Sequence, residues 1–160
     1  MAWQLEMVRI LRYLIDDVDA TTYDNSRLEE TLLVGAQLIL NEISFDNTYT
    51  IDVDSLTLSP DPTTLATKDN AFINLTSLRS AIIVVAGELK ASSAYSISVQ
   101  DGPSSINFGQ LFKNKKEMLA LLQEQFSNAK LAYLAGNSIA GQVVMTPTTY
   151  ENYYAGFFPN

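Results

Sequence analysis

The sequence predicts a small, mainly α-helical domain, and three observations lead to that prediction. Apolar residues recur at helical spacing in four segments, a short alternating stretch lies between the second and the third, and the 160 residues are 47% apolar and 18% charged. We expect a four-helix bundle-like domain over residues 1–136, with β insertions near 48–58 and 97–108. Residues 137–160 show no sustained helical period and contain Gly and Pro, so we expect an extended C-terminal arm there.

Two helices are expected first. Apolar residues at helical spacing predict a helix between Leu5 and Val18, through Val8, Leu11 and Ile15. Charged residues on its other side are spaced to pair with one another: Glu6, Arg9, Arg12 and Asp16. Ser26 and Glu29 have the spacing of a capping box, which predicts the start of a second helix. Its apolar stripe is Leu28, Leu32, Ala36, Ile39 and Ile43.

A strand is expected next, because the apolar period changes from helical spacing to two at Thr48. The side chains that would share one face are Tyr49, Ile51 and Val53. The apolar residues change parity after this point, so a turn or bulge must lie near Asp54 and Ser55. Pro60 and Pro62 then end the element, because proline has no N–H to donate to a strand ladder.

The second half of the domain is expected to contain two more helices. Asp69 opens an apolar stripe formed by Phe72, Leu75, Leu78, Ile82, Val85 and Leu89. A short hairpin between Ile97 and Phe108 follows, because alternating pairs flank a polar turn: Asp101, Gly102, Pro103 and Ser104. The last stripe is Leu119, Leu122, Phe126, Ala129 and Tyr133, and Gly136 is placed to end that helix.

Residues for catalysis or metal binding are scarce. The chain has no Cys and no His, which removes thiol nucleophiles, disulfides, the usual general base and the commonest metal ligand. Asp16, Asp17 and Asp19 form the densest carboxylate cluster, and a hydrolase would need one of them in a cleft. An EF-hand loop counted from Asp17 would need Gly and Glu where Thr22 and Leu28 stand. We therefore expect no enzyme activity, cofactor or metal.

Other charged groups are interpreted as solvated. Asp52 and Asp54 fall on the polar side of the expected strand, and Lys113, Lys115 and Lys116 form the basic cluster near the start of the fourth helix. A formal net charge of −8 argues against binding of nucleic acid through its phosphate groups. The same charge is compatible with a surface that DNA passes without binding.

The sequence also favours a protein made and used inside a cell. The N-terminal stretch MAWQLEMVRILRYLIDD lacks the basic leader and long apolar run of a signal peptide. The strongest apolar run, AIIVVAG, is far shorter than the roughly 20 residues that span a bilayer. We interpret that run as part of a buried helix and expect no membrane partner.

Five aromatic rings near the C-terminus are candidate binding residues: Tyr150, Tyr153, Tyr154, Phe157 and Phe158. A contiguous apolar surface commonly marks an interaction site, so the first interpretation is an arm that docks on a partner. The alternative is a clasp that folds back over the protein's own core.

The order of elements and four segments carry a resemblance to a known family. The segments are RILRYLIDD, YDNSRLEETLLVGAQLILNEI, SPDPTTLATKDNAFINLTSLRSA and ISVQDGPSSINF. Over about Val8 to Tyr133 the chain resembles the head-tail connector proteins of tailed bacteriophages, also called adaptor or head-completion proteins. It departs from them in the long region Thr48 to Pro62 and in its aromatic tail.

The resemblance implies a non-enzymatic virion protein that assembles in the host cytoplasm. Such a subunit forms a ring, typically dodecameric, under the portal protein, extends the DNA channel and links the head to the next neck or tail protein. The arm from Thr146 to Asn160 would then dock on the portal or on a neighbouring subunit, and the Asp101–Ser104 turn would face the channel or bridge subunits. The alternative is an intracellular binding module that uses its aromatic arm as a monomer or dimer.

Overall fold

The computed structural model describes residues 2–96 and 108–136, which form four helices and one two-stranded sheet. The helices are α1 (Ala2–Leu14), α2 (Asn25–Leu40), α3 (Asn70–Ser96) and α4 (Phe108–Gly136), and the strands are β1 (Thr50–Asp52) and β2 (Thr57–Ser59). The prediction of a small, mainly α-helical domain with a β insertion near residues 48–58 is confirmed.

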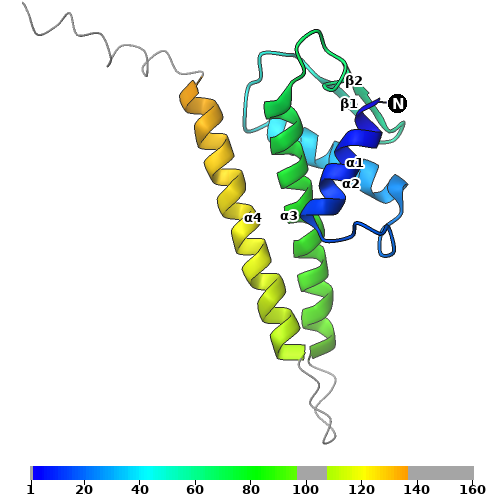
Figure 1. The fold of residues 1–160 in the computed structure, drawn as a ribbon, viewed down its shortest axis with the longest axis vertical. Coiled ribbons are helices and arrows are strands. Elements are labelled where there is room, and N and C mark those ends of the chain that lie inside the picture. Colours follow the sequence, from blue (N-terminus) through cyan, green and yellow to red (C-terminus); the bar gives the residue numbers. More distant parts are fainter. Residues whose placement is uncertain (1, 97–107, 137–160) are drawn as a thin grey trace, which may run out of the picture.

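Helix α3 is the central element of the domain. Helices α1 and α2 pack against one side of it, and α4 runs antiparallel beside it on another side (Figure 1). The stripe expected for this helix faces the core: Phe72, Leu75, Leu78 and Val85 are buried, and Ile82 and Leu89 are half-buried. The buried residues of α1, α2 and α4 join these in one core, as apolar faces of packed helices do.

Helix α2 approaches α3 closely at Gly35. A Cβ on Gly35 would lie 2.3 Å from Ser80 Oγ, which is far inside van der Waals contact. That hydroxyl is held in place, since it lies 2.8 Å from the backbone oxygen of Thr76 and 3.2 Å from that of Thr31. Glycine therefore sets the separation of the two helices at this point.

The ends of the first two helices differ from the sequence prediction. Helix α1 ends at Leu14 instead of Val18, because Asp16 takes a left-handed conformation with φ of 59°. Helix α2 is capped by Asp24, whose side chain accepts a hydrogen bond from the backbone N–H of Arg27. The expected capping box of Ser26 and Glu29 is wrong, because Ser26 already lies inside the helix.

Strands β1 and β2 form an antiparallel hairpin, which places the expected turn near Asp54 and Ser55. The turn is closed by Asp52, whose Oδ1 accepts the backbone N–H groups of Asp54 at 3.0 Å and Ser55 at 3.2 Å. Tyr49, just before β1, stacks on Phe72 with ring centroids 3.9 Å apart. This contact fastens the hairpin to the start of α3.

Helix α4 begins earlier than predicted. Phe108, expected to pair in a second hairpin, is instead the first residue of α4, so the hairpin between Ile97 and Phe108 is wrong at that end. A 29-residue helix offers continuous backbone hydrogen bonding, which a short two-stranded pairing does not match. Residues 97–107 and the expected arm over 137–160 lie outside the described residues. Helix α4 is described as far as Gly136, the residue expected to end it.

One helix is long and apolar enough to cross a membrane by length and composition. It is the segment Asn70–Ala91 of α3, and half of it is buried inside the protein. The other three helices all pack against α3, which is the usual arrangement of a core helix. The AIIVVAG run lies in this segment, with Ala81 and Val85 buried and Gly87 exposed.

Candidate protein-interaction surfaces

The two sets of residues that the sequence singles out for binding lie outside the described residues. They are the aromatic tail, Tyr150, Tyr153, Tyr154, Phe157 and Phe158, and the polar turn, Asp101, Gly102, Pro103 and Ser104. Their roles stay predictions. The candidate surfaces described next are built from residues 2–96 and 108–136 alone.

The acidic cluster after α1 is organised around Asp17, which is buried. Its Oδ2 accepts a hydrogen bond from Arg12 Nη1 at 2.5 Å and one from the backbone N–H of Tyr23 at 3.3 Å. Its Oδ1 accepts the backbone N–H groups of Thr21 at 3.1 Å and Thr22 at 2.9 Å. Both carboxylate oxygens are thus engaged, by Arg12 of α1 and by backbone N–H groups of the loop between α1 and α2.

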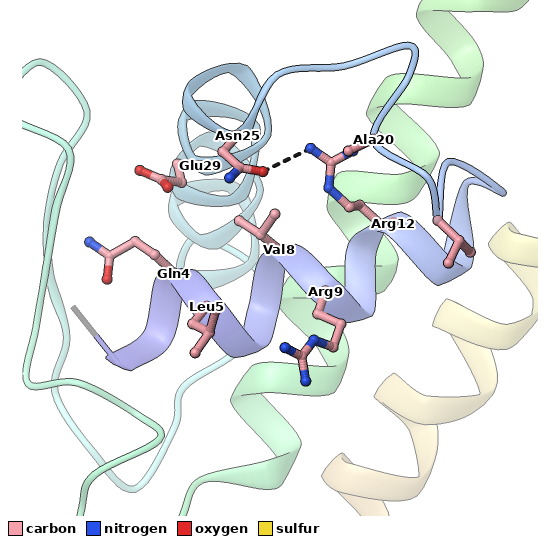
Figure 2. A pocket seen from close by; sticks show the side chains of 9 residues that line it. Gln4, Leu5, Val8, Arg9, Arg12, Ala20, Asn25 and Glu29 are labelled. Carbon is pink, nitrogen blue, oxygen red and sulfur yellow. Dashed lines mark hydrogen bonds between the residues drawn. The ribbon is translucent and has the colours of Figure 1, made fainter.

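Arg12 also links α1 to the start of α2. Its Nη2 donates to the backbone oxygen of Tyr23 at 2.8 Å and to Asn25 Oδ1 at 2.8 Å. Figure 2 shows the second of these hydrogen bonds. The expected pairing of Arg12 with Asp16 along a helix is wrong, because the helix has ended and Asp16 is exposed. The side chains of Arg12 and Asp17 therefore hold the loop in one conformation.

The electrostatics of Asp17 follow from these contacts. Burial acts to raise the pKa of its carboxyl group, since a charge is costly away from water. The backbone hydrogen bonds from Thr22 and Tyr23, the positive charge of Arg12 and the hydrogen bond from Thr21 outweigh burial. The pKa of Asp17 is consequently below its ordinary value of 3.8.

The basic cluster at the start of α4 is divided among separate contacts. Lys115 Nζ lies 2.7 Å from a carboxylate oxygen of Glu88 on α3, and both side chains are mostly buried. Lys113 Nζ lies 3.8 Å from Glu117 one turn along the helix. Lys116 is exposed. Of the three lysines, Lys115 thus joins α3 to α4, while Lys113 and Lys116 are exposed to solvent.

The outward side of α1 carries two exposed apolar side chains with a cation between them. Leu5, Arg9 and Tyr13 recur every four residues and lie on one side of the helix, which we call the α1 outer face. Leu5 is 69% exposed and Tyr13 67% exposed. Figure 2 shows Leu5 and Arg9 projecting from α1 together, beside a groove of about 480 Å³ between α1 and the start of α2.

The outward side of α4 is long and nearly uncharged. We call its part from Ala120 onward the α4 outer face, and the exposed residues there are Ala120, Leu121, Glu124, Asn128, Leu131 and Ala135; before it on the same side lie Lys113 and Glu117. Leu121 is 54% exposed and Leu131 64% exposed. Helical spacing places Glu124 and Leu131 opposite the buried Leu122 and Phe126, which pack on α3. The face is thus turned away from the core.

One carboxylate, that of Glu42, forms ion pairs with both α3 and α4 and thereby fixes the rotation of α4 about its axis. Glu42, just after α2, binds Arg79 of α3 at 3.1 Å through Oε1 and Lys130 of α4 at 2.8 Å through Oε2. Arg79 also lies over the ring of Phe126, with its guanidinium carbon 5.5 Å from the ring centroid. The hydrogen bond from Lys130 and the charge of Arg79 hold the pKa of Glu42 below its ordinary value, although burial opposes them.

Reactive groups do not converge in the part of the chain that the structure describes. Within residues 2–96 and 108–136 no three acidic side chains come together in a way that would hold a metal ion. Comparison of the chain with protein-family models, with curated proteins and with solved structures finds no match. The α1 and α4 outer faces carry the most exposed large apolar side chains of the described residues, and we take them as the candidate functional surfaces. Exposed apolar surface of this kind suits contact with another protein.

The sequence analysis did not identify either outer face, although both leave a signal. Leu5, Arg9 and Tyr13 repeat at four-residue spacing, but the charges of the first helix were interpreted as pairing with one another. In α4 the stretch from Met118 to Gly136 carries only two charged residues, Glu124 and Lys130. Such depletion of charge on an exposed helix is typical of the centre of an interface.

Proposed function

We propose that this protein is a structural, non-enzymatic subunit of a head-tail adaptor ring in a tailed bacteriophage. It assembles in the host cytoplasm and becomes part of the virion neck. The ring, with twelve subunits as in the connector proteins that the sequence resembles, docks under the portal protein. It extends the DNA channel and presents a platform to the next neck or tail protein.

One observation of the structure supports assembly most directly. The subunit presents strongly exposed apolar side chains on α1 and on α4, two helices that lie on different sides of α3 (Figure 1). Two distinct contact faces are what a subunit needs in order to bind one neighbour on each side. The mainly helical fold and the element order agree with the resemblance that the sequence carries.

The charge of the chain supports the remaining part of the proposal. A formal net charge of −8 disfavours tight contact with phosphate groups, so DNA can pass a ring of such subunits without being gripped. The aromatic tail is assigned to docking on the portal or on a neighbouring subunit. Each buried aromatic side chain contributes about 1.5–3 kcal/mol before ordering costs, so five rings can supply a large part of an interface.

The test is electron microscopy of the purified protein, alone and mixed with the candidate portal. We expect rings in one or both samples. A variant that ends before Thr146 should keep its helical circular dichroism and melting temperature but should lose portal or neighbour binding in a pull-down. Changing Tyr153, Tyr154, Phe157 and Phe158 to Ser should have the same effect as the truncation, because the rings carry the contact.

Two outcomes contradict this proposal. A protein that stays monomeric in both samples at high concentration is not a ring subunit. A truncated chain whose melting temperature falls by more than roughly 10 °C has lost a clasp over its own core, because that drop exceeds the effect of about 2 kcal/mol in a domain of this size. The tail would then be a structural element of the monomer.

A further inference from the structure

We propose that the α4 outer face of one copy packs against the α1 outer face of the next copy, with Glu124 paired to Arg9 across the contact. This inference rests on the proposed ring assembly and names the surfaces that build it. The contact is head-to-tail, since each subunit contributes a different face to each of its two neighbours.

The first argument is the charge pattern of α4. From Met118 to Gly136 the charged residues are Glu124 and Lys130, and Lys130 is bound to Glu42 within the subunit. Glu124 is exposed and forms no ion pair with any other described residue. Leu121 and Leu131 lie on either side of it along the helix. The face thus carries one unpaired negative charge, about 4.5 Å from Leu121 and about 10.5 Å from Leu131 along the axis, and Glu117, seven residues earlier on the same side, is already paired with Lys113.

The second argument is that the α1 outer face has the opposite arrangement. Arg9 lies between Leu5 and Tyr13, and within the described residues it forms no ion pair. The other carboxylate on this side of the helix, Glu6, is already bound to Lys68. Arg9 is therefore a cation surrounded by exposed apolar surface and available to a partner.

The two faces also match in length. At a rise of about 1.5 Å per residue, Leu5 and Tyr13 are about 12 Å apart along α1, and Leu121 and Leu131 are about 15 Å apart along α4. If Leu5 packs beside Leu121, Arg9, about 6 Å further along α1, comes close to Glu124, about 4.5 Å further along α4, and Tyr13 comes close to Leu131. An ion pair in a contact that excludes water contributes more than one on the surface, and it sets the register of the two helices.

Self-association of either face alone is disfavoured by the same charges. A contact between two α4 outer faces would have negative charge on both sides and one between two α1 outer faces would have positive charge on both sides, so neither gains the attraction of opposite charges. Because α1 and α4 lie on different sides of α3 (Figure 1), a copy that binds one neighbour through one of these helices leaves the other helix free. Head-to-tail contacts of this kind add subunits until the ring closes.

A charge exchange tests the pairing in the full-length chain. Arg9→Glu or Glu124→Arg alone should raise the concentration at which the assembly dissociates by at least about ten-fold, because each brings like charges together. The double variant should return to within about three-fold of the original. Sedimentation velocity measures the assembly, circular dichroism verifies folding, and Glu30→Arg, at an exposed position of α2 outside both faces, is the matched control.

Disulfide trapping gives a second readout, because the chain has no cysteine of its own. A chain with both Arg9→Cys and Glu124→Cys should form a ladder of covalent oligomers under mild oxidation. The two single variants mixed together should stop at dimers, and each single variant by itself should stay uncrosslinked. Cross-linking of a single variant with itself would show a two-fold contact and would overturn the head-to-tail arrangement.

The outcomes separate this inference from the proposed function. If rings form but charge reversal at Arg9 or Glu124 changes the dissociation concentration no more than Glu30→Arg does, the inference is wrong and another contact holds the ring together. If the charge exchange fails to restore assembly, the two residues do not pair. If no assembly forms with or without the portal, the proposed function and this inference are both wrong.

Discussion

Changing Asp17 to Asn should destabilise the protein strongly, although the two side chains have nearly the same shape. The amide oxygen can keep accepting the N–H groups of Thr21 and Thr22, which the carboxylate holds at 3.1 and 2.9 Å. Its NH₂ group then faces Arg12 Nη1 and the N–H of Tyr23, both of which are donors. Removing one partner of a buried ion pair costs about 3–5 kcal/mol.

Urea unfolding followed by circular dichroism measures this loss, and thermal unfolding should show a decrease of roughly 10 °C in melting temperature. Asp19→Asn is the control, because Asp19 is exposed and its change should stay within about 0.5 kcal/mol. A loss below about 1 kcal/mol for Asp17→Asn would refute the reasoning. It would mean that the pair makes no net contribution in the folded state.

The pH dependence of the same variant has a defined sign. The pKa of Asp17 is lowered in the folded protein, so the unfolded state takes up the proton first as pH falls below 3.8. The stability that Asp17 contributes is therefore present at neutral pH and is lost as pH falls through its folded pKa. The difference in unfolding free energy between the original chain and Asp17→Asn should shrink over that acidic range.

Two further predictions concern packing and tyrosine ionisation. Gly35→Ala should lower the free energy of unfolding in urea by about 1–3 kcal/mol, because its Cβ would lie 2.3 Å from Ser80 Oγ. Adding Ser80→Ala should recover most of the loss. A Gly35→Ala variant as stable as the original chain would contradict the close approach. Tyr23 and Tyr49 are buried and donate hydrogen bonds to Glu88 and Asp69, so their pKa values are raised well above 10. Their contribution to stability is present below pH 10 and is lost as pH rises further. An ultraviolet absorbance titration should therefore show Tyr23 and Tyr49 ionising only as the protein unfolds, and the amplitude of that step should decrease by one tyrosine after Tyr49→Phe.

The helices were predictable because each buries an apolar stripe against the same core. The expected residues Phe72, Leu75 and Leu78 are buried in α3, and Leu122 and Phe126 are buried in α4. Helix ends were harder to predict, because they depend on a few local contacts. Several residue types can cap a helix, and the sequence contains both Asp24 and Ser26 near the start of α2.

The candidate surfaces were not predicted because exposure is a property of the packed molecule. Leu131 and Leu122 are the same type of residue and lie in the same helix, but only Leu122 is buried against α3. Similarly, Arg9 and Arg12 are one turn apart, and the structure alone shows that Arg12 is held within the subunit while Arg9 is exposed. Sequence spacing gives the faces of a helix but does not say which face meets the core.

The position of Trp3 gives the protein a built-in optical reporter. It is the single tryptophan of the chain, it is buried near the start of α1, and its backbone N–H donates to Asp61 Oδ2 at 3.0 Å. Its indole lies in the apolar core while Leu5, two residues further along, is exposed. Indole emission shifts to longer wavelength when the ring meets water, so intrinsic fluorescence distinguishes an assembly lost by detachment of α1 from one lost between intact subunits.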